Sequence, residues 1–255
     1  MLDQPLIDTF LDAHPWPLLF VTVSGAHLYG FESADSDIDL RGAHVTPVRE
    51  IVRLSPPSET YEVMDKNARV EMDVVTHDVK KFFTLLLKNN GYVLEQVCSP
   101  LVVRTTPEFE ELRALAPRTV TKHHRHHFMG FGQNQWAAVL KDGKPTVKGL
   151  LYTYRVLLAG IHLMQTQKVE SNLRKLNGTF KLSHIDDLIA QKVAGKEYDL
   201  LEGADLGWHE KEFNRLVALL DDARDRSSLP DEVSCRNEID DLLVRVRMKH
   251  VDRVD

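Results

Sequence analysis

The sequence predicts an α+β protein in which a small domain with a mixed sheet is followed by an α-helical domain. Two observations predict this class. In the first part of the chain, short apolar runs rich in β-branched residues alternate with helical stretches. Beyond about residue 115, apolar residues recur at the spacing of an α-helix almost throughout. The predicted division therefore places the first domain at 1–115 and the second at 116–255.

The first domain contains two predicted helices and several predicted strands. Residues 2–14 carry an apolar residue every three or four positions until Pro15 and Pro17, which predicts a helix that ends there. Residues 77–87 predict a second helix, which Asn89-Asn90-Gly91 ends. The predicted strands are short, apolar and bounded by turn residues: 18–23, 38–45, 61–64 and 70–76.

The second domain is predicted to be helical because its apolar residues keep a helical period between short runs of helix breakers. The predicted helices are 123–140, 149–165, 182–193, 213–223 and 238–251. The segments expected to separate them contain glycine, proline, asparagine or serine: 142–145, Asn177-Gly178, Gly203 and 227–230.

Bulk composition limits the classes of function. The chain has 255 residues, 43% of them hydrophobic, and a formal net charge of -6, so any nucleic-acid site must be a local patch. Its two cysteines, Cys98 and Cys235, are far apart in sequence, which argues against a disulfide framework. Neither a signal peptide nor an apolar run long enough to span a membrane is recognisable. We expect a cytoplasmic protein with no membrane partner.

Three aspartates are candidate metal ligands. Asp37 and Asp39 lie two residues apart at a predicted strand, so both carboxylates point to one face. Asp73 lies on a later strand and reaches them if the two strands pair, with Glu71 as the rival third ligand. Converging carboxylates repel one another, and a hard cation such as Mg²⁺ or Mn²⁺ removes that conflict. The alternative is that these residues are solvent-facing charges on an edge strand.

A turn of small residues, Ser24, Gly25 and Ala26, directly follows the first predicted strand. Gly25 allows main-chain amides to approach a phosphate closely, and a helix starting near Ala26 would present free N–H groups to an anion. Ser24 offers a hydroxyl donor. His27 and Tyr29 follow, and each either contacts a bound nucleotide or packs in the core. The alternative for the whole segment is a plain strand-to-helix turn.

Two groups of residues in the helical half suggest binding. Lys148, Tyr152 and Arg155 are spaced to share one helix face, where they can hold a triphosphate and stack on a base. A solvated basic face with a core tyrosine is the alternative. The run 123–127 contains four histidines around Arg125. It suggests a zinc site, a basic patch with Lys122 for a phosphate-bearing acceptor, or an ordinary surface helix.

These residues resemble a known family. The glycine turn, Tyr29-Gly30 and the run Ser36-Asp37-Ile38-Asp39-Leu40-Arg41-Gly42 resemble the motif of the DNA polymerase beta-like nucleotidyltransferase superfamily. The closer resemblance is to the predicted nucleotidyltransferases associated with RNA ligase and RNA repair, and it covers about 18–250. That family usually has serine directly after the glycine, whereas this chain has Ala26 there and its hydroxyl at Ser24.

The resemblance implies a metal-dependent enzyme that moves a nucleoside monophosphate from a nucleoside triphosphate to an acceptor hydroxyl, an RNA end in repair. Asp37, Asp39 and Asp73 would be the catalytic residues and the ligands of Mg²⁺ or Mn²⁺. The implied nucleotide-binding residues are Ser24, Gly25, Ala26, His27, Tyr29, Lys148, Tyr152 and Arg155. One alternative is transfer of AMP to a protein acceptor, as superfamily antitoxins are thought to do. The other, suggested by Ala26, is a non-catalytic nucleotide- or RNA-binding module.

Overall fold

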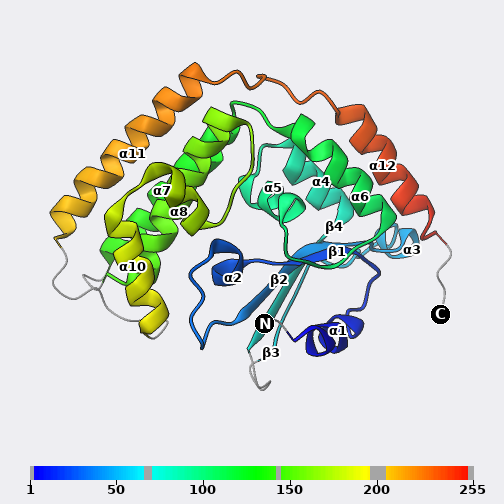
Figure 1. Ribbon diagram of the computed structural model, residues 1–255. Helices are drawn as coiled ribbons and strands as arrows, with labels where there is room; N and C mark the ends of the chain where they lie inside the picture. Colours follow the sequence, from blue (N-terminus) through cyan, green and yellow to red (C-terminus); the bar gives the residue numbers. More distant parts are fainter. Residues whose placement is uncertain (1–2, 66–70, 142–144, 196–204, 252–255) are drawn as a thin grey trace.

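A computed structural model describes residues 3–65, 71–141, 145–195 and 205–251. It contains a five-stranded mixed sheet, with helices on both faces and a helical half beside it (Figure 1). The strands are β1 (Leu18–Val23), β2 (Ile38–His44), β3 (Thr60–Asp65), β4 (Met72–Asp78) and β5 (Val102–Arg104). The helices around the sheet are α1 (Gln4–Asp12), α2 (Gly25–Tyr29), α3 (Val48–Ile51), α4 (Val79–Leu87), α5 (Gly91–Cys98) and α6 (Pro107–Leu115). The short 3₁₀ helix η1 (Ala116–Thr119) leads to α7 (His124–Leu140), α8 (Val147–Thr166), α9 (Leu173–Phe180), α10 (Ser183–Ala194), α11 (Leu206–Arg226) and α12 (Arg236–Met248).

The sheet has the order β3-β4-β2-β1-β5. Its central pair, β2 and β4, is parallel, while the other pairs are antiparallel. Helix α1 covers one face, and α4, α5 and α6 lie over the other (Figure 1). Because both faces are covered, β1 is apolar along nearly its whole length. In the first part of β2 and along all of β4, buried and half-buried residues alternate. The half-buried side chains of β2 and β4 therefore lie opposite α1, on the side of the helical half.

Two apolar clusters fill the molecule. The smaller one lies between α1 and the sheet, where Ile7 and Leu11 pack against Ile38, Leu40 and other strand residues. The larger one continues from the opposite sheet face into the helical half. Helix α8 is its centre, since α7, α9, α10 and α11 all contact it. The predicted division at residue 115 falls at the end of α6 and stays a prediction. None of the helices in the described residues is long and apolar enough to cross a membrane.

The predicted strands and long helices are confirmed where the structure describes them, although α11 begins at Leu206 rather than at the predicted residue 213. The expected break at Asn177-Gly178 is wrong, since both residues lie inside α9. The side-chain amide of Asn177 donates hydrogen bonds to the Leu182 carbonyl and the Asp186 carboxylate. The helix ends instead at Lys181, which has a positive φ of 56°. Gly203, 142–144 and Val70 lie outside the described residues.

Asp78 joins the end of the sheet to the last helix. Its carboxylate caps α4 at the Lys80 amide (3.0 Å) and accepts the Thr46 amide (3.2 Å). It is also paired with Arg247 of α12, whose guanidinium donates to the Thr46 carbonyl (2.6 Å). These bonds hold the pKa of Asp78 below its ordinary value against the opposing effect of burial. Helix α12 is therefore anchored by an ionised, almost buried carboxylate.

Acid is expected to destabilise the fold before its carboxylates are protonated. His44 and His124 are 0% exposed, and burial lowers the pKa of each to about 4. In the unfolded chain each imidazole titrates near about 6.5, so from there down to about 4 the unfolded state binds more protons. The free energy of unfolding must then fall as pH falls through this window. Urea midpoints at about pH 7.5 and about pH 5 measure it, and an unchanged midpoint would contradict this account.

Candidate active site

The glycine turn is fixed against β2. The Ser24 amide donates to the Asp39 carbonyl (2.8 Å), which holds the end of β1 beside β2. Gly25 then adopts a positive φ of 60°, and a Cβ atom built on it would lie 1.8 Å from Asp39 Oδ2. Only glycine satisfies both constraints. The turn thus brings the main chain that begins α2 into contact with a carboxylate.

The other end of α2 is held by the helical half. Gly30 has a φ of 81° and ends the helix, and an added Cβ would lie 2.5 Å from the Asn172 side chain. Arg174, one residue into the first turn of α9, donates to the Gly30 carbonyl (2.6 Å). The position of the turn therefore depends on both halves of the molecule. Ala26 is buried in α2, and His27 is half-buried on the same short helix.

Two of the three predicted carboxylates lie side by side. In the parallel pairing of β2 and β4, Asp39 and Asp73 are partners in register. Their side chains are 19% and 13% exposed. Asp37 precedes the first residue of β2 and is also half-buried. The predicted convergence of the two strands is confirmed, while the chemical roles of these aspartates stay a prediction.

Arg41 binds both carboxylates with a fully occupied guanidinium. Nη2 donates to Asp39 Oδ1 (2.6 Å) and Asp73 Oδ2 (2.7 Å). Nη1 donates to the carbonyls of Leu40 (3.0 Å) and Asp73 (2.9 Å), and Nε donates to the Tyr92 hydroxyl (2.9 Å). An arginine has five N–H donors, so each one here has an acceptor. Arg41 therefore sets the spacing of the two carboxylates and ties them to α5.

Burial and charges of both signs act on the Asp39 carboxyl. Burial raises the pKa of the Asp39 carboxyl, and the negative charges of Asp37 and Asp73 add to that effect. Arg41 and the more distant Lys148, at the start of α8, act in the opposite direction. The pKa of Asp39 therefore responds to both other predicted ligands and to a predicted triphosphate contact. A further cation beside these carboxylates would favour the ionised form.

An aromatic cavity of about 350 Å³ opens next to these carboxylates. Asp39, Arg41, Ser24 and Gly25 line its polar end. Its remaining walls are aromatic: Tyr29, Tyr92, Phe131 and Tyr152. Helices α2, α5, α7 and α8 each contribute one of these rings, and the Tyr29 and Tyr152 rings meet edge to face at 5.5 Å. The cavity combines flat apolar walls with a charged end, as a nucleotide requires.

Tyr92 and Phe131 are site residues that the sequence did not single out. Tyr92 directly follows the Asn89-Asn90-Gly91 breaker, and no local pattern marks it as a site residue. Phe131 lies on α7 with no local pattern that separates it from a core residue. By contrast, Tyr152 lines the cavity as expected, and the Lys148 ammonium lies 5.7 Å from its ring centre.

Arg155 lies beneath the cavity. It is 2% exposed and donates to Glu95 (2.8 Å) in a buried ion pair. Its guanidinium carbon also lies 3.8 Å from the centre of the Tyr29 ring. The predicted contact between Arg155 and a triphosphate stays a prediction, although the structure shows its guanidinium supporting Tyr29 instead. Glu95 was missed as its partner, and its only signal in sequence is a carboxylate inside the apolar run 93–97.

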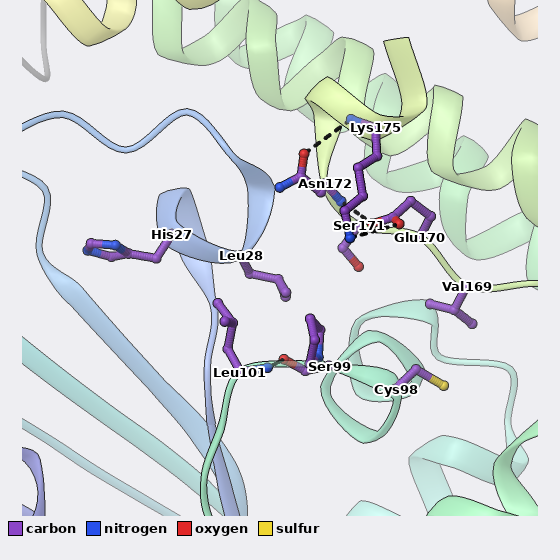
Figure 2. Close-up of a pocket in the computed structure, with 11 residues that line it drawn as sticks. His27, Leu28, Cys98, Ser99, Leu101, Val169, Glu170, Ser171, Asn172 and Lys175 are labelled. Carbon is purple, nitrogen blue, oxygen red and sulfur yellow. Dashed lines mark hydrogen bonds and ion pairs between the residues drawn. The ribbon is translucent and has the colours of Figure 1, made fainter. Parts of the chain in front are cut away.

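A second cavity of about 350 Å³ lies between α2, the residues that follow α5 and the loop before α9 (Figure 2). His27, Ser99 and Asn172 are among its lining residues, and Figure 2 shows the His27 ring turned away from Glu170 and Asn172. The charged side chains that line it, Glu170 and Lys175, form an ion pair (3.6 Å). None of the three predicted aspartates lines this cavity, whereas Asp39 lines the aromatic one, so we place the candidate active site at the aromatic cavity.

The carboxylate pair suits a divalent cation. Within the described residues, Asp73 Oδ1 is buried without a hydrogen-bond partner, a costly state for a carboxylate oxygen unless a cation faces it. The described residues contain no group of three His, Cys, Asp or Glu side chains already arranged around a common metal position. The metal site at Asp37, Asp39 and Asp73 stays a prediction, in which Asp37 would have to turn toward the other two carboxylates.

The chain is similar to several known proteins. The chain is 27% identical over 219 residues to the uncharacterized protein MJ0002 of Methanocaldococcus jannaschii, covering 85% of this chain and 88% of that protein. A solved structure of a nucleotidyltransferase-like protein from Exiguobacterium sibiricum 255-15 is similar at 11% identity with a TM-score of 0.34, covering 98% of this chain and 80% of that one. The model of the RNA repair pathway DNA polymerase beta family (RlaP) matches residues 4–245. The chain therefore belongs to the RNA repair pathway DNA polymerase beta family.

Proposed function

We propose that this protein transfers a nucleoside monophosphate from a nucleoside triphosphate to the hydroxyl of an RNA end, with Mg²⁺ or Mn²⁺ bound at its aspartates. The observation that carries the proposal is the in-register pair Asp39 and Asp73, of which Asp39 contacts the Gly25 turn and lines the aromatic cavity. Membership of the RNA repair family supports the RNA end as acceptor.

The residues divide between the nucleotide and the acceptor. The acceptor oxygen attacks the α-phosphorus, the bond to the β-phosphate oxygen breaks, and pyrophosphate leaves. Asp73, with its unbonded Oδ1, receives the proton of the acceptor hydroxyl. A divalent cation held by Asp37, Asp39 and Asp73 supplies charge neutralisation at the phosphates when bound. Positioning and charge account for most of the catalysis in this chemistry.

The turn and the aromatic walls hold the rest of the nucleotide. Ser24 and the main chain after Gly25 face the phosphates at the polar end of the cavity. Tyr29 and Tyr152 stack on the base or sugar, while Lys148 neutralises the departing pyrophosphate. Arg155 contributes by holding Tyr29 in place.

Incorporation of labelled nucleotide tests the proposal. The protein is incubated with labelled ATP, CTP, GTP or UTP, Mg²⁺ or Mn²⁺, and RNAs with defined 3′ ends. We expect label on an RNA end, and Asp73→Asn should reduce its rate by about 100-fold because it removes a base while keeping the shape of the side chain. Exposed Asp222→Asn on α11 is the control and should not change the rate.

The same experiment separates the alternatives. Label on an added partner protein, identified by mass spectrometry, would indicate that the acceptor is a protein hydroxyl and not an RNA end. Nucleotide that binds without turnover would indicate the non-catalytic module. Absence of both binding and incorporation by folded protein would overturn the proposal altogether.

A further inference from the structure

A third cavity, of about 420 Å³, lies between the start of α7 and the residues that join α4 to α5. We call it the histidine groove and define it by its polar lining residues: Lys88, Asn89, Asn90, His123, His126 and His127. Nothing in the proposed transfer of a nucleotide uses it. The six side chains carry no negative charge, although the chain as a whole has a net charge of -6.

The histidine rings of the groove are arranged as flat, nearly parallel surfaces and not around a common metal position. His123 and His126 are exposed and nearly parallel, with ring centres 6.1 Å apart and an angle of 15°. One turn further along α7, the His127 ring is parallel to Phe131 at 6.0 Å and 11°. Burial lowers the pKa of His127 to about 4, so its ring is neutral at physiological pH. The described residues contain no group of three metal-ligand side chains, so the zinc hypothesis has no support.

The histidine groove adjoins the aromatic cavity. Phe131, which stacks on His127, is itself a wall of that cavity. On the opposite side, Gly91 fits so closely that an added Cβ would lie 2.6 Å from the His127 ring. The next residue, Tyr92, lines the cavity and accepts a hydrogen bond from Arg41. The rings of His127, Phe131 and Tyr92 thus connect the histidine groove to Arg41, which binds the two carboxylates.

We propose that the histidine groove binds the single-stranded 3′ segment of a nucleic-acid acceptor and directs its terminal hydroxyl toward Asp73. This inference rests on the proposed function. Bases stack on flat aromatic rings, and a lysine such as Lys88 neutralises a phosphate without reading sequence. From His123 to Phe131 a helix rises about 12 Å, which accommodates about three stacked nucleotides. The Oδ1 atoms of Asn89 and Asn90 already accept hydrogen bonds from Thr121 and from the Val93 amide, so their NH₂ groups are the donors for base edges or sugars.

Oligonucleotide binding in the absence of divalent metal tests the inference. The probe is a fluorescent oligouridylate of about eight nucleotides, followed by anisotropy at several salt concentrations. The double variant Lys88→Ala/His126→Ala should bind it about 10-fold more weakly, and Lys88→Ala alone should reduce the salt slope by about one. The matched control is Lys211→Ala/Trp208→Ala, which removes an exposed lysine and an exposed ring from α11 and should not change binding.

Binding of a nucleoside triphosphate, measured in the same variants, separates this inference from the proposed function. We expect it to be unchanged, because the groove does not line the aromatic cavity. Oligonucleotide affinity that is equal in wild type and double variant would overturn the inference, as would a wild-type protein that binds no oligonucleotide. If the triphosphate still binds at the aromatic cavity in either case, the proposed function is unaffected.

Discussion

Gly25→Ala is expected to reduce nucleotidyl transfer by more than about 100-fold. The new Cβ would lie 1.8 Å from Asp39 Oδ2, so the carboxylate or the turn must move by more than about 1 Å. A displacement of about 1 Å in a catalytic site lowers the rate by about 100-fold. The positive φ adds a backbone penalty of about 1–2 kcal/mol to the folded state. Incorporation rates and urea unfolding measure the two effects separately.

Gly178→Ala is the matched control for this substitution. Gly178 lies in α9, and no atom lies within 4 Å of the position that its Cβ would take. Alanine there should leave the rate unchanged and add up to about 1 kcal/mol of helix stability. A Gly25→Ala protein with the wild-type rate would show that the contact between the turn and Asp39 is irrelevant to catalysis.

Glu95→Ala is expected to cost about 3–5 kcal/mol of folding free energy. It removes the partner of Arg155 and leaves a guanidinium charge buried at 2% exposure. The paired replacement Glu95→Leu/Arg155→Met removes both charges and should recover most of that loss. Because Arg155 also stacks on Tyr29, the double variant should still bind the triphosphate more weakly than wild type. Urea midpoints and nucleotide titrations give the two readouts.

The half-exposed pair Arg125 and Asp221 is the control for burial. Asp221 is 47% exposed, so Asp221→Ala should cost less than about 1 kcal/mol. Equal losses for Glu95→Ala and Asp221→Ala would contradict the account of the buried pair.

The sequence predicted the parts of the site whose local pattern is strong. Alternation placed Asp37 and Asp39 on one face of their strand and Asp73 on a later strand that had to pair beside it. In the structure the two strands pair, with Asp39 and Asp73 in register. The turn at Gly25 was also predicted, because the small residues Ser24, Gly25 and Ala26 directly follow a predicted strand. These features depend on neighbours in sequence, which periodicity can detect.

What the sequence did not predict depends on residues far apart in the chain. The bond of Arg41 to Tyr92 spans 51 residues, and that of Arg155 to Glu95 spans 60. Helix α5 was missed because most of its residues are buried, so it lacks a polar side and a helical period. Asn177 and Gly178 suggested a break, yet both lie inside α9, where the Asn177 side chain donates to the Leu182 carbonyl and the Asp186 carboxylate.

A crystal structure with a non-hydrolysable nucleoside triphosphate and Mn²⁺ tests the central claim most directly. Anomalous scattering locates the metal without reference to activity. We predict a manganese peak in contact with Asp39 and Asp73, phosphates beside the Gly25 turn, and the base in the aromatic cavity against the Tyr152 ring. A triphosphate bound in the cavity of Figure 2, or a metal peak away from both aspartates, would contradict the account.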